Sequence, residues 1–282
     1  MASGTVVITG SSTGIGRACA LHLDRAGFDV FAGVRRPADG EGLRSEASEK
    51  LRPLIVDVTD GDGIAAAAAE VREAVGERGL TGLVNNAGVT VTGPLEFVAI
   101  DDLRRQLEVN LVGHVAVTQA FLPLIRAARG RIVNVSSIGG RVVNAFLGPY
   151  QASKFAIEAV TDALRKELRP WGIHVVAVEP GTIDTEMWRK GTDEAREAIE
   201  ALTPEARELY GETLPKVLEA SQKLSQRAAP PERVAQVIER GLTASRPRTR
   251  YVVGADAQVQ LMLDRLLPDR AVDAVQARFL GI

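Results

Sequence analysis

The stretch TVVITGSSTGIG at residues 5–16 decides the fold that we predict for this chain. An apolar, β-branched run ends at Thr9-Gly10, and an apolar pattern of helical spacing begins at Ile15. Small residues in such a turn let the backbone approach a pyrophosphate, and the helix's free N–H groups and positive end attract it. The glycines are spaced Gly-x-x-x-Gly-x-Gly rather than Gly-x-Gly-x-x-Gly, so the prediction of nucleotide binding rests on the strand-turn-helix setting.

Short β-branched runs alternate with longer helical patterns along most of the chain. The expected strands are 5–9, 30–32, 54–57, 82–84, 131–135, 174–178 and 250–253, and the expected helices are 15–25, 64–75, 103–128, 150–168 and 232–244. Such alternation is typical of parallel strands joined by helical crossovers, which cover the sheet on both faces. We therefore predict an α/β fold with a Rossmann-type, doubly wound parallel sheet, in a single domain that spans residues 1–282.

The composition excludes several other classes of protein. A chain of 282 residues with 45% apolar residues can bury a full core. Its formal net charge of -2 offers no basic field to nucleic acid and no polybasic run to a membrane. The single cysteine, Cys19, excludes an internal disulfide, and no uninterrupted apolar run reaches the ~18 residues of a membrane span. We expect a cytoplasmic protein with small-molecule partners, no nucleic acid, no membrane insertion and no metal site.

The glycine turn also matches the nucleophile elbow of an α/β-hydrolase, because it reads Gly-x-Ser-x-Gly around Ser12. An elbow needs a later acid and then a histidine, and its oxyanion loop precedes the serine. Only nine residues precede Gly10, and neither His114 nor His174 follows an obvious acid in a loop. A serine hydrolase that uses Ser12 is therefore the less favoured alternative.

Charged residues after the second and third strands bear on the choice of cofactor. An acidic residue after the second strand would bond the ribose hydroxyls of NAD, whereas arginine would accept the extra phosphate of NADP. Arg35 and Arg36 follow that strand, with Asp39 close by, so NADP(H) is favoured and NAD(H) stays possible. Asp57, which precedes Val58, either accepts from an adenine amino group or caps the next turn.

Tyr150 and Lys154 share a face if this segment is helical, because residues four apart are neighbours on a helix. An unperturbed tyrosine titrates near ~10, too high for a base that works at neutral pH. A cation about 4 Å away, at an effective dielectric of about 20, is worth up to roughly 4 kcal/mol or about 3 pKa units. We therefore expect Lys154 to lower the pKa of Tyr150, although this spacing by itself usually marks a solvated helix face.

Five motifs in register resemble the short-chain dehydrogenases/reductases over roughly residues 4 to 255. They are Thr9-Gly10-x-x-x-Gly14-Ile15-Gly16, Asn85-Asn86-Ala87-Gly88, Ser137, Tyr150-x-x-x-Lys154 and Pro180-Gly181. The resemblance implies an NAD(P)-dependent oxidoreductase that acts on CH–OH groups. The stretch from Gly140-Arg141 to Pro180-Gly181 looks like the branch that holds retinol and 17β-hydroxysteroid dehydrogenases.

The resemblance implies a role for each site residue. Tyr150 is similar to the family's proton donor, and Lys154 to the residue that lowers its pKa and holds the nicotinamide ribose. Ser137 resembles the serine that orients the carbonyl, and Asn110 the asparagine whose helix kink holds the water of a proton relay. Thr185 resembles the threonine that bonds the nicotinamide carboxamide. The cofactor site implied in this way comprises Thr9, Gly10, Ser12, Thr13, Gly14, Ile15, Gly16, Arg35, Arg36, Asp57, Val58, Asn86, Ala87, Gly88, Tyr150, Lys154, Pro180, Gly181, Ile183 and Thr185.

Two segments are expected to form the substrate site. Residues 186–227 have the pattern of a helical lid, and the loop 138–149 supplies an apolar opposite wall. The expected substrate contacts are Val142, Asn144, Phe146, Met187 and Trp188. Since the walls are apolar, we expect a steroid-, retinoid- or fatty-like secondary alcohol or ketone.

Residues 256–282 add a helical extension that either covers the lid or joins a neighbouring subunit. The family resemblance implies pairing through helices 103–128 and 150–168, so we expect a homodimer or homotetramer. Two further functions stay open, a 3-oxoacyl-type ketoreductase and an NADP(H)-sensing binding protein without turnover. The intact catalytic residues argue against a pure binding protein, which has no need of a proton donor.

Overall fold

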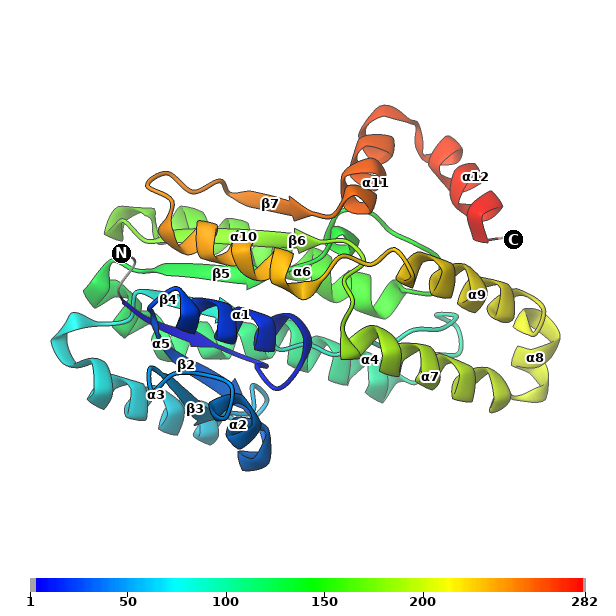
Figure 1. The fold of residues 1–282 in the computed structure, drawn as a ribbon. Helices are drawn as coiled ribbons and strands as arrows, with labels where there is room; N and C mark the ends of the chain where they lie inside the picture. Colours follow the sequence, from blue (N-terminus) through cyan, green and yellow to red (C-terminus); the bar gives the residue numbers. More distant parts are fainter. Residues whose placement is uncertain (1–3, 281–282) are drawn as a thin grey trace.

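Within residues 4–280, which the computed structural model describes, seven parallel strands form one sheet in the order β3-β2-β1-β4-β5-β6-β7 (Figure 1). The strands are β1 Thr5–Ile8, β2 Asp29–Val34, β3 Leu51–Ile55, β4 Gly82–Asn85, β5 Arg131–Val135, β6 His174–Pro180 and β7 Arg250–Val253. The predicted doubly wound sheet is confirmed. Because the strand order reverses between β1 and β4, a ligand crevice is expected outside the carboxyl ends of these two strands.

Helices cover both faces of the sheet, since successive side chains of a strand point to opposite faces (Figure 1). Val6 and Ile8 of β1 pack with α1, α2 and α10, whereas Val7 packs with α3, α5 and α6. The helices around the sheet are α1 Gly14–Arg25, α2 Pro37–Arg44, α3 Gly61–Val75, α4 Ile100–Leu107, α5 Gly113–Ala128, α6 Gly148–Glu167 and α10 Pro231–Thr243, with short 3-10 turns η1 Gly76–Arg78, η3 Ile138–Gly140 and η4 Arg169–Trp171.

Two local features differ from the sequence prediction. The helix α2 was not expected, and β3 begins at Leu51 rather than at residue 54. Pro53 lies inside β3 and is aligned with Ala32 of β2. A proline is tolerated there because β3 is an edge strand, whose outer side needs no hydrogen-bond partner.

The predicted helix at residues 103–128 is interrupted. A π-helical turn, η2 Glu108–Val112, separates α4 from α5. The run Ile100–Ala128 is long and apolar enough to cross a membrane by length and composition alone, the one such run among the described residues. In the fold, Val117, Phe121 and Ile125 of this run are buried in the core that covers the sheet.

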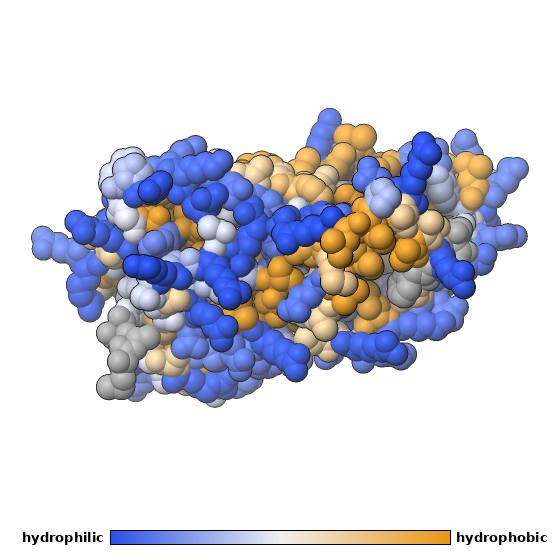
Figure 2. All heavy atoms as spheres, turned by 90° about the horizontal axis from the view of Figure 1, so that it is seen from above, coloured by the Kyte–Doolittle hydropathy of each residue, from blue (hydrophilic) through white to orange (hydrophobic). Residues whose placement is uncertain are grey.

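The segments after β6 that are expected to form the lid and the extension are helical. The lid comprises α7 Glu186–Glu200, α8 Pro204–Tyr210 and α9 Thr213–Ser225, and the extension comprises α11 Ala255–Leu266 and α12 Asp269–Leu280. The helix α12 packs against α9, and Gln276 Nε2 donates to the Val143 carbonyl (2.8 Å), so the extension covers the lid (Figure 1). Figure 2, viewed from above, shows apolar side chains gathered over α11, where Val259, Met262 and Leu266 are exposed.

Candidate active site

The glycine turn is fixed in a shape that leaves its backbone accessible. Gly10 and Gly14 have φ angles of 68° and 56°, in the left-handed region that favours glycine. A Cβ atom on Gly16 would overlap the Gly10 carbonyl and the Asn86 amide. That amide donates to the carbonyls of Thr9 (3.0 Å) and Gly10 (3.1 Å), which ties the turn to the end of β4. These residues fit a dinucleotide, because the turn admits close backbone approach at the start of α1.

Thr9 has a different part in the site from the one predicted. Its side chain is buried, and its hydroxyl accepts from the backbone N–H groups of Asn86 (3.0 Å) and Ala87 (3.1 Å). Thr9 therefore joins β1 to β4 and shapes the crevice from behind. Thr185, at the start of α7, lies beside Gly14. The residue predicted to bond the nicotinamide carboxamide is therefore next to the glycine turn.

The other predicted cofactor residues also follow the carboxyl ends of the strands. Ser12, Thr13 and Ile15 belong to the turn after β1, Ala87 and Gly88 follow β4, Val58 follows β3, and Pro180, Gly181 and Ile183 end or follow β6. Gly181 is held by its N–H, which donates to the Val253 carbonyl (2.8 Å). The fold thus gathers these segments at one edge of the sheet.

Two pairs of side chains, Arg36 with Asp39 and Asp57 with Thr59, follow β2 and β3, where the adenosine end of a dinucleotide is expected. Arg36 is exposed and donates to both carboxylate oxygens of Asp39 (3.0 and 2.8 Å). Asp57 accepts from the N–H (2.9 Å) and the hydroxyl (2.8 Å) of Thr59, which is the capping alternative. Burial alone would raise the pKa of Asp57, but the Thr59 bonds and the Arg35 charge outweigh it and lower that pKa.

Tyr150 lies in the first turn of α6, and the Ser137 hydroxyl is near enough to its side chain to act on its pKa. Ser137 Oγ also accepts from the Gly139 N–H (3.0 Å), which holds the serine at the start of η3. Burial raises the pKa of Tyr150 above its usual value, and the nearby Ser137 hydroxyl only partly opposes this. The expectation that the chain by itself lowers this pKa was wrong.

The position of Lys154 explains the difference. Its Nζ lies 5.7 Å from the centroid of the Tyr150 ring and donates to the Val135 carbonyl (2.9 Å) rather than to the tyrosine hydroxyl. Burial lowers the pKa of Lys154 to about 8, while the nearby charge of Glu158 opposes this change. The Lys154 ammonium group therefore begins to lose its proton at a pH only slightly above neutral.

Asn110 lies in the π-helical turn, so the predicted helix kink is confirmed at this residue. Its Oδ1 accepts from the Val89 N–H (2.9 Å), and its Nδ2 donates to the Val89 carbonyl (3.0 Å) and to Ser153 Oγ (3.1 Å). Ser153 in turn donates to the Tyr150 carbonyl (2.6 Å). Asn110 thus connects the loop after β4 to the turn of α6 that carries the tyrosine.

His114 is a site residue whose role the sequence did not indicate, since it was considered only as a hydrolase base. It is buried, and its Nε2 lies 2.7 Å from the Ala87 carbonyl. Burial and the Lys154 charge lower the pKa of His114 to about 4, so the neutral ring donates to that carbonyl. The histidine therefore fixes the loop after β4 from beneath.

An apolar cavity of about 330 Å³ lies between the loop after β4, the loop before α6 and α8. It is lined by Gly93, Pro94, Leu95, Val143, Asn144, Ala145, Phe146, Gly148 and Tyr210. The Tyr210 ring meets Phe97 (6.0 Å between centroids) and Phe146 (6.1 Å) edge to face, and its hydroxyl donates to Glu96 (2.5 Å). Phe146 has a φ of 68°, a strained conformation for a bulky residue. Tyr210 therefore fastens the lid over this cavity.

The remaining predicted substrate contacts lie in different surroundings. Val142 is buried in a small core with Ile138 and Ala257, so it does not line the cavity as predicted. Met187 and Trp188 lie in the first turn of α7, directly after Thr185. Met187 is exposed and Trp188 is half-buried, so both remain available to a substrate beneath the lid.

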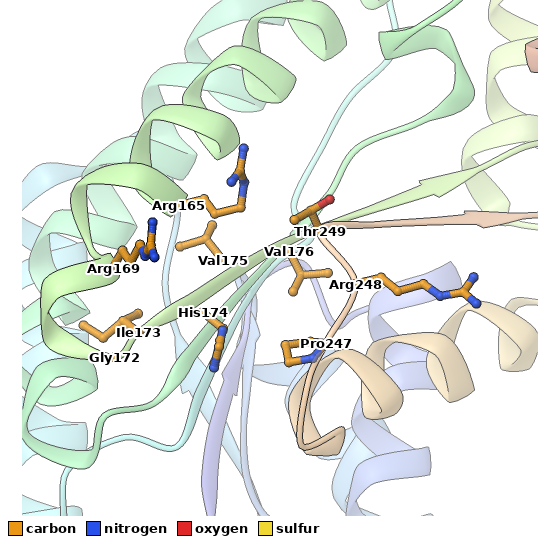
Figure 3. Close-up of a pocket in the computed structure, with 10 residues that line it drawn as sticks. All are labelled: Arg165, Arg169, Gly172, Ile173, His174, Val175, Val176, Pro247, Arg248 and Thr249. Carbon is orange, nitrogen blue, oxygen red and sulfur yellow. The ribbon is translucent and has the colours of Figure 1, made fainter.

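A second cavity, of about 290 Å³, lies at the opposite edge of the sheet, where β6 begins (Figure 3). Figure 3 shows Arg165 and Arg169 on one side of it, while Arg248 points away from them. His174, at the amino end of β6, also lines it. Its lining lies at the amino ends of β6 and β7, at the edge of the sheet opposite the glycine turn, so this cavity lies outside the catalytic site.

The structure does not support Ser12 as a nucleophile. His22 pairs with Glu239 (2.7 Å), and His114 bonds the Ala87 carbonyl. His174 begins β6 at the edge opposite the glycine turn. Each of the chain's three histidines is thus placed elsewhere, and none supplies the base that an elbow requires.

Comparison with known proteins gives concordant matches. A sequence model of the family described as short chain dehydrogenase matches residues 4–196. Retinol dehydrogenase 5 of Mus musculus is 41% identical over 276 residues, covering 96% of this chain and 86% of the relative. 17-beta-hydroxysteroid dehydrogenase type 6 of Bos taurus is 40% identical over 282 residues, covering 97% and 87%.

Solved structures give the same result. A short-chain dehydrogenase from Streptomyces avermitilis has a TM-score of 0.77 at 28% identity and covers 100% of this chain and 96% of its own. A short chain dehydrogenase from Burkholderia cenocepacia J2315, in complex with NADP, has a TM-score of 0.73 at 26% identity, with coverages of 99% and 98%. These similarities extend over the sheet, the lid and the extension.

Proposed function

The chain belongs to the short-chain dehydrogenases, oxidoreductases that act on CH–OH groups with NAD(P), and we propose that it interconverts a secondary alcohol and a ketone on an apolar substrate with NADP(H). The observation that carries the proposal is the placement of Tyr150 and Ser137 together, beside buried Lys154 and at the sheet edge that holds the glycine turn. This arrangement provides a proton donor next to a dinucleotide crevice.

The chain's own residues supply the proton and the orientation of the substrate. The nicotinamide cofactor supplies or accepts the hydride. Tyr150 is protonated at neutral pH, because burial raises its pKa, so it suits the donation of a proton to a carbonyl oxygen. Ser137 holds the same oxygen, and Lys154 fixes the ribose hydroxyls of the cofactor. For alcohol oxidation Tyr150 must first lose its proton, which the positive charge of an oxidised nicotinamide favours.

The preference for NADP(H) rests on Arg35 and Arg36, two exposed cations that follow β2. Their place suits the phosphate on the adenosine ribose of NADP. The similar protein from Burkholderia cenocepacia J2315, crystallised with NADP, gives this choice a precedent. Titrating protein fluorescence with NADPH and with NADH gives the two dissociation constants. Tighter binding of NADH would overturn the preference.

The substrate class follows from the cavity under Tyr210. Among the described residues that line it, no side chain carries a charge. This lining suits a steroid-, retinoid- or fatty-like body better than the charged carrier of a 3-oxoacyl group. The relatives named as retinol and 17-beta-hydroxysteroid dehydrogenases support the same class.

The proposal is tested by following NADPH absorbance against a panel of steroid, retinoid, fatty and aromatic ketones, with alcohols and NADP in the reverse direction. We expect turnover on at least one apolar pair. A 3-oxoacyl thioester turned over in preference to every apolar ketone would favour the ketoreductase alternative. Tight NADPH binding without turnover on any panel member would favour the sensor.

We also propose that the protein is a cytoplasmic homo-oligomer. Val112, at the end of the π turn, and Phe155, on α6, are both exposed apolar residues. They lie on the two helical segments through which we expect subunits to pair. Burying such side chains between subunits is favourable. Light scattering should give a dimer or tetramer, and cell fractionation should place the protein in the soluble fraction. A monomer, or recovery with membranes, would overturn the corresponding part.

A further inference from the structure

A cluster of charged side chains joins segments that lie far apart in the sequence. Glu179, at the end of β6, is fully buried, and its Oε1 pairs with Arg141 Nη1 (3.1 Å) and Arg250 Nε (3.2 Å). Arg250, which opens β7, also pairs through Nε with Glu158 Oε2 (2.9 Å) and through Nη2 with Asp162 Oδ2 (3.1 Å). Asp162 also pairs with Arg165 Nη2 (3.1 Å), so the cluster holds three carboxylates and three arginines.

One carboxylate of this cluster, that of Glu158, lies one helical turn from the catalytic lysine. Glu158 follows Lys154 by four residues on α6, so the two side chains share a face, and both are about 95% buried (6% and 5% exposed). A Cβ on Gly140 would lie 2.8 Å from the Lys154 carbonyl and 3.0 Å from Glu158 Cγ. The loop that carries the catalytic serine thus packs flat against this turn and excludes water from it.

We propose that Glu158 is a positioning residue whose carboxylate keeps the Lys154 ammonium charged. The inference rests on the proposed function, because it assigns a control of the same catalytic lysine. A charged lysine binds the ribose hydroxyls of the cofactor more strongly than a neutral one. Glu158 itself touches neither substrate nor cofactor.

The other groups around Lys154 do not provide this charge. His114 faces it from α5 and is neutral above about pH 4, its lowered pKa. Tyr150, on the same helix, is also neutral because burial raises its pKa. The strand β5 offers the Val135 carbonyl, which accepts from Nζ but carries no net charge. Of the described residues whose charge acts on Lys154 to raise its pKa, Glu158 is the carboxylate.

The direct test measures the titration of Lys154 in the free protein, so it needs neither substrate nor turnover. The protein is labelled with ¹³Cε-lysine, and the Lys154 signal is assigned by its loss in Lys154→Met. We expect a wild-type midpoint near pH 8 and a midpoint about one pH unit lower in Glu158→Gln. A Glu158→Gln midpoint that is equal to or above the wild-type value overturns the inference.

Matched variants separate this effect from a structural one. Asp162→Asn removes an equal charge that also pairs with Arg250 but lies one turn farther from Lys154, so its midpoint should fall less than half as far. An equal fall of the Lys154 midpoint in Asp162→Asn would mean that the ion pairs of Arg250 as a whole set this midpoint, and it would overturn the specific role of Glu158. Arg250→Gln removes a cation instead, so the Lys154 midpoint should rise. This opposite shift keeps the inference testable even where Glu158→Gln does not fold, and a fall in Arg250→Gln overturns it.

The same variants then report on turnover. Ketone reduction with NADPH should decline above the Lys154 midpoint, and in Glu158→Gln the decline should begin about one pH unit lower, with kcat near the wild-type value at the acid end. Glu158→Gln could shift the Lys154 midpoint measured by NMR and leave the pH dependence of ketone reduction unchanged. That result would show that turnover does not use the charge of Lys154, and it would overturn the catalytic part of the inference. Absence of any wild-type turnover would refute the proposed function while the NMR result stood.

Discussion

Replacing Asn110 with alanine should weaken both the fold and the reaction, because its side chain makes three hydrogen bonds at once. Two go to the N–H (2.9 Å) and carbonyl (3.0 Å) of Val89, and the third to Ser153 Oγ (3.1 Å). Each such bond contributes ~1 kcal/mol net, and a buried group left without a partner costs ~1–3 kcal/mol. Because Val89 is only half-buried and water can reach it, we expect a loss of about 3 kcal/mol in unfolding free energy.

The catalytic effect follows from the same geometry. Ser153 donates to the Tyr150 carbonyl (2.6 Å), so Asn110 fixes the helical turn that carries the proton donor. A loosened donor should lower kcat for ketone reduction by about tenfold or more. Urea unfolding followed by circular dichroism gives the stability loss, and NADPH oxidation gives kcat.

Gln106 provides a matched control. It is buried like Asn110, and it bonds the Val91 N–H (2.6 Å) and the Val89 carbonyl (2.8 Å), but it has no bond to α6. Gln106→Ala should therefore lose a similar stability, about 2 kcal/mol, while its kcat falls by less than about threefold. Equal losses of kcat in the two variants would refute the link through Ser153, and a stability loss under about 1 kcal/mol in Asn110→Ala would refute the hydrogen-bond reasoning.

Three further outcomes are expected. Tyr150→Phe should abolish turnover and leave the NADPH dissociation constant within about threefold, measured by fluorescence titration; retained turnover would remove Tyr150 from the mechanism. Tyr210→Ala should raise KM for an apolar ketone more than Tyr210→Phe, which keeps the ring contacts and loses only the Glu96 bond; equal KM values would show that the lid contact does not act on the substrate. The unfolding free energy should fall by about 2 kcal/mol between pH 7 and pH 5, because the unfolded chain protonates His114 below about 6.5 and the folded chain only below about 4. Urea unfolding at both pH values measures this fall, and His114→Gln should remove it.

The fold was predictable because its signals are local. The β-branched runs and helical patterns repeat along the chain, and the turn after β1 has the residues that a dinucleotide crevice needs. The helix kink at Asn110 was expected from the family resemblance, whereas its three bonds to Val89 and Ser153 were not visible in the sequence. The start of β3 was misplaced because a proline inside a strand is tolerated only at a sheet edge, and the edge is known only from the topology.

The parts of the site that were missed depend on contacts between distant residues. Tyr210 meets Glu96 across 114 positions, and Arg250 meets Glu158 across 92. No periodicity in either segment indicates such a partner. His114 was likewise identified as a site residue only when the fold placed the Ala87 carbonyl against its ring. Spacing along the chain predicts which helix face a residue occupies, and packing decides what meets that face.

The pair of Tyr150 and Lys154 shows how the two kinds of information combine. The four-residue spacing correctly placed both side chains on one face of α6, but it implied a direct charge effect that the packing does not provide. Nζ turns to the Val135 carbonyl, and burial then favours the neutral form of both groups, raising the pKa of the phenol and lowering that of the ammonium. Burial thus keeps the proton on Tyr150, where reduction needs it, but favours the loss of a proton from Lys154. The pair therefore depends on a fixed negative charge to keep the lysine active, and Glu158 is placed one turn away on the same helix, held by Arg250.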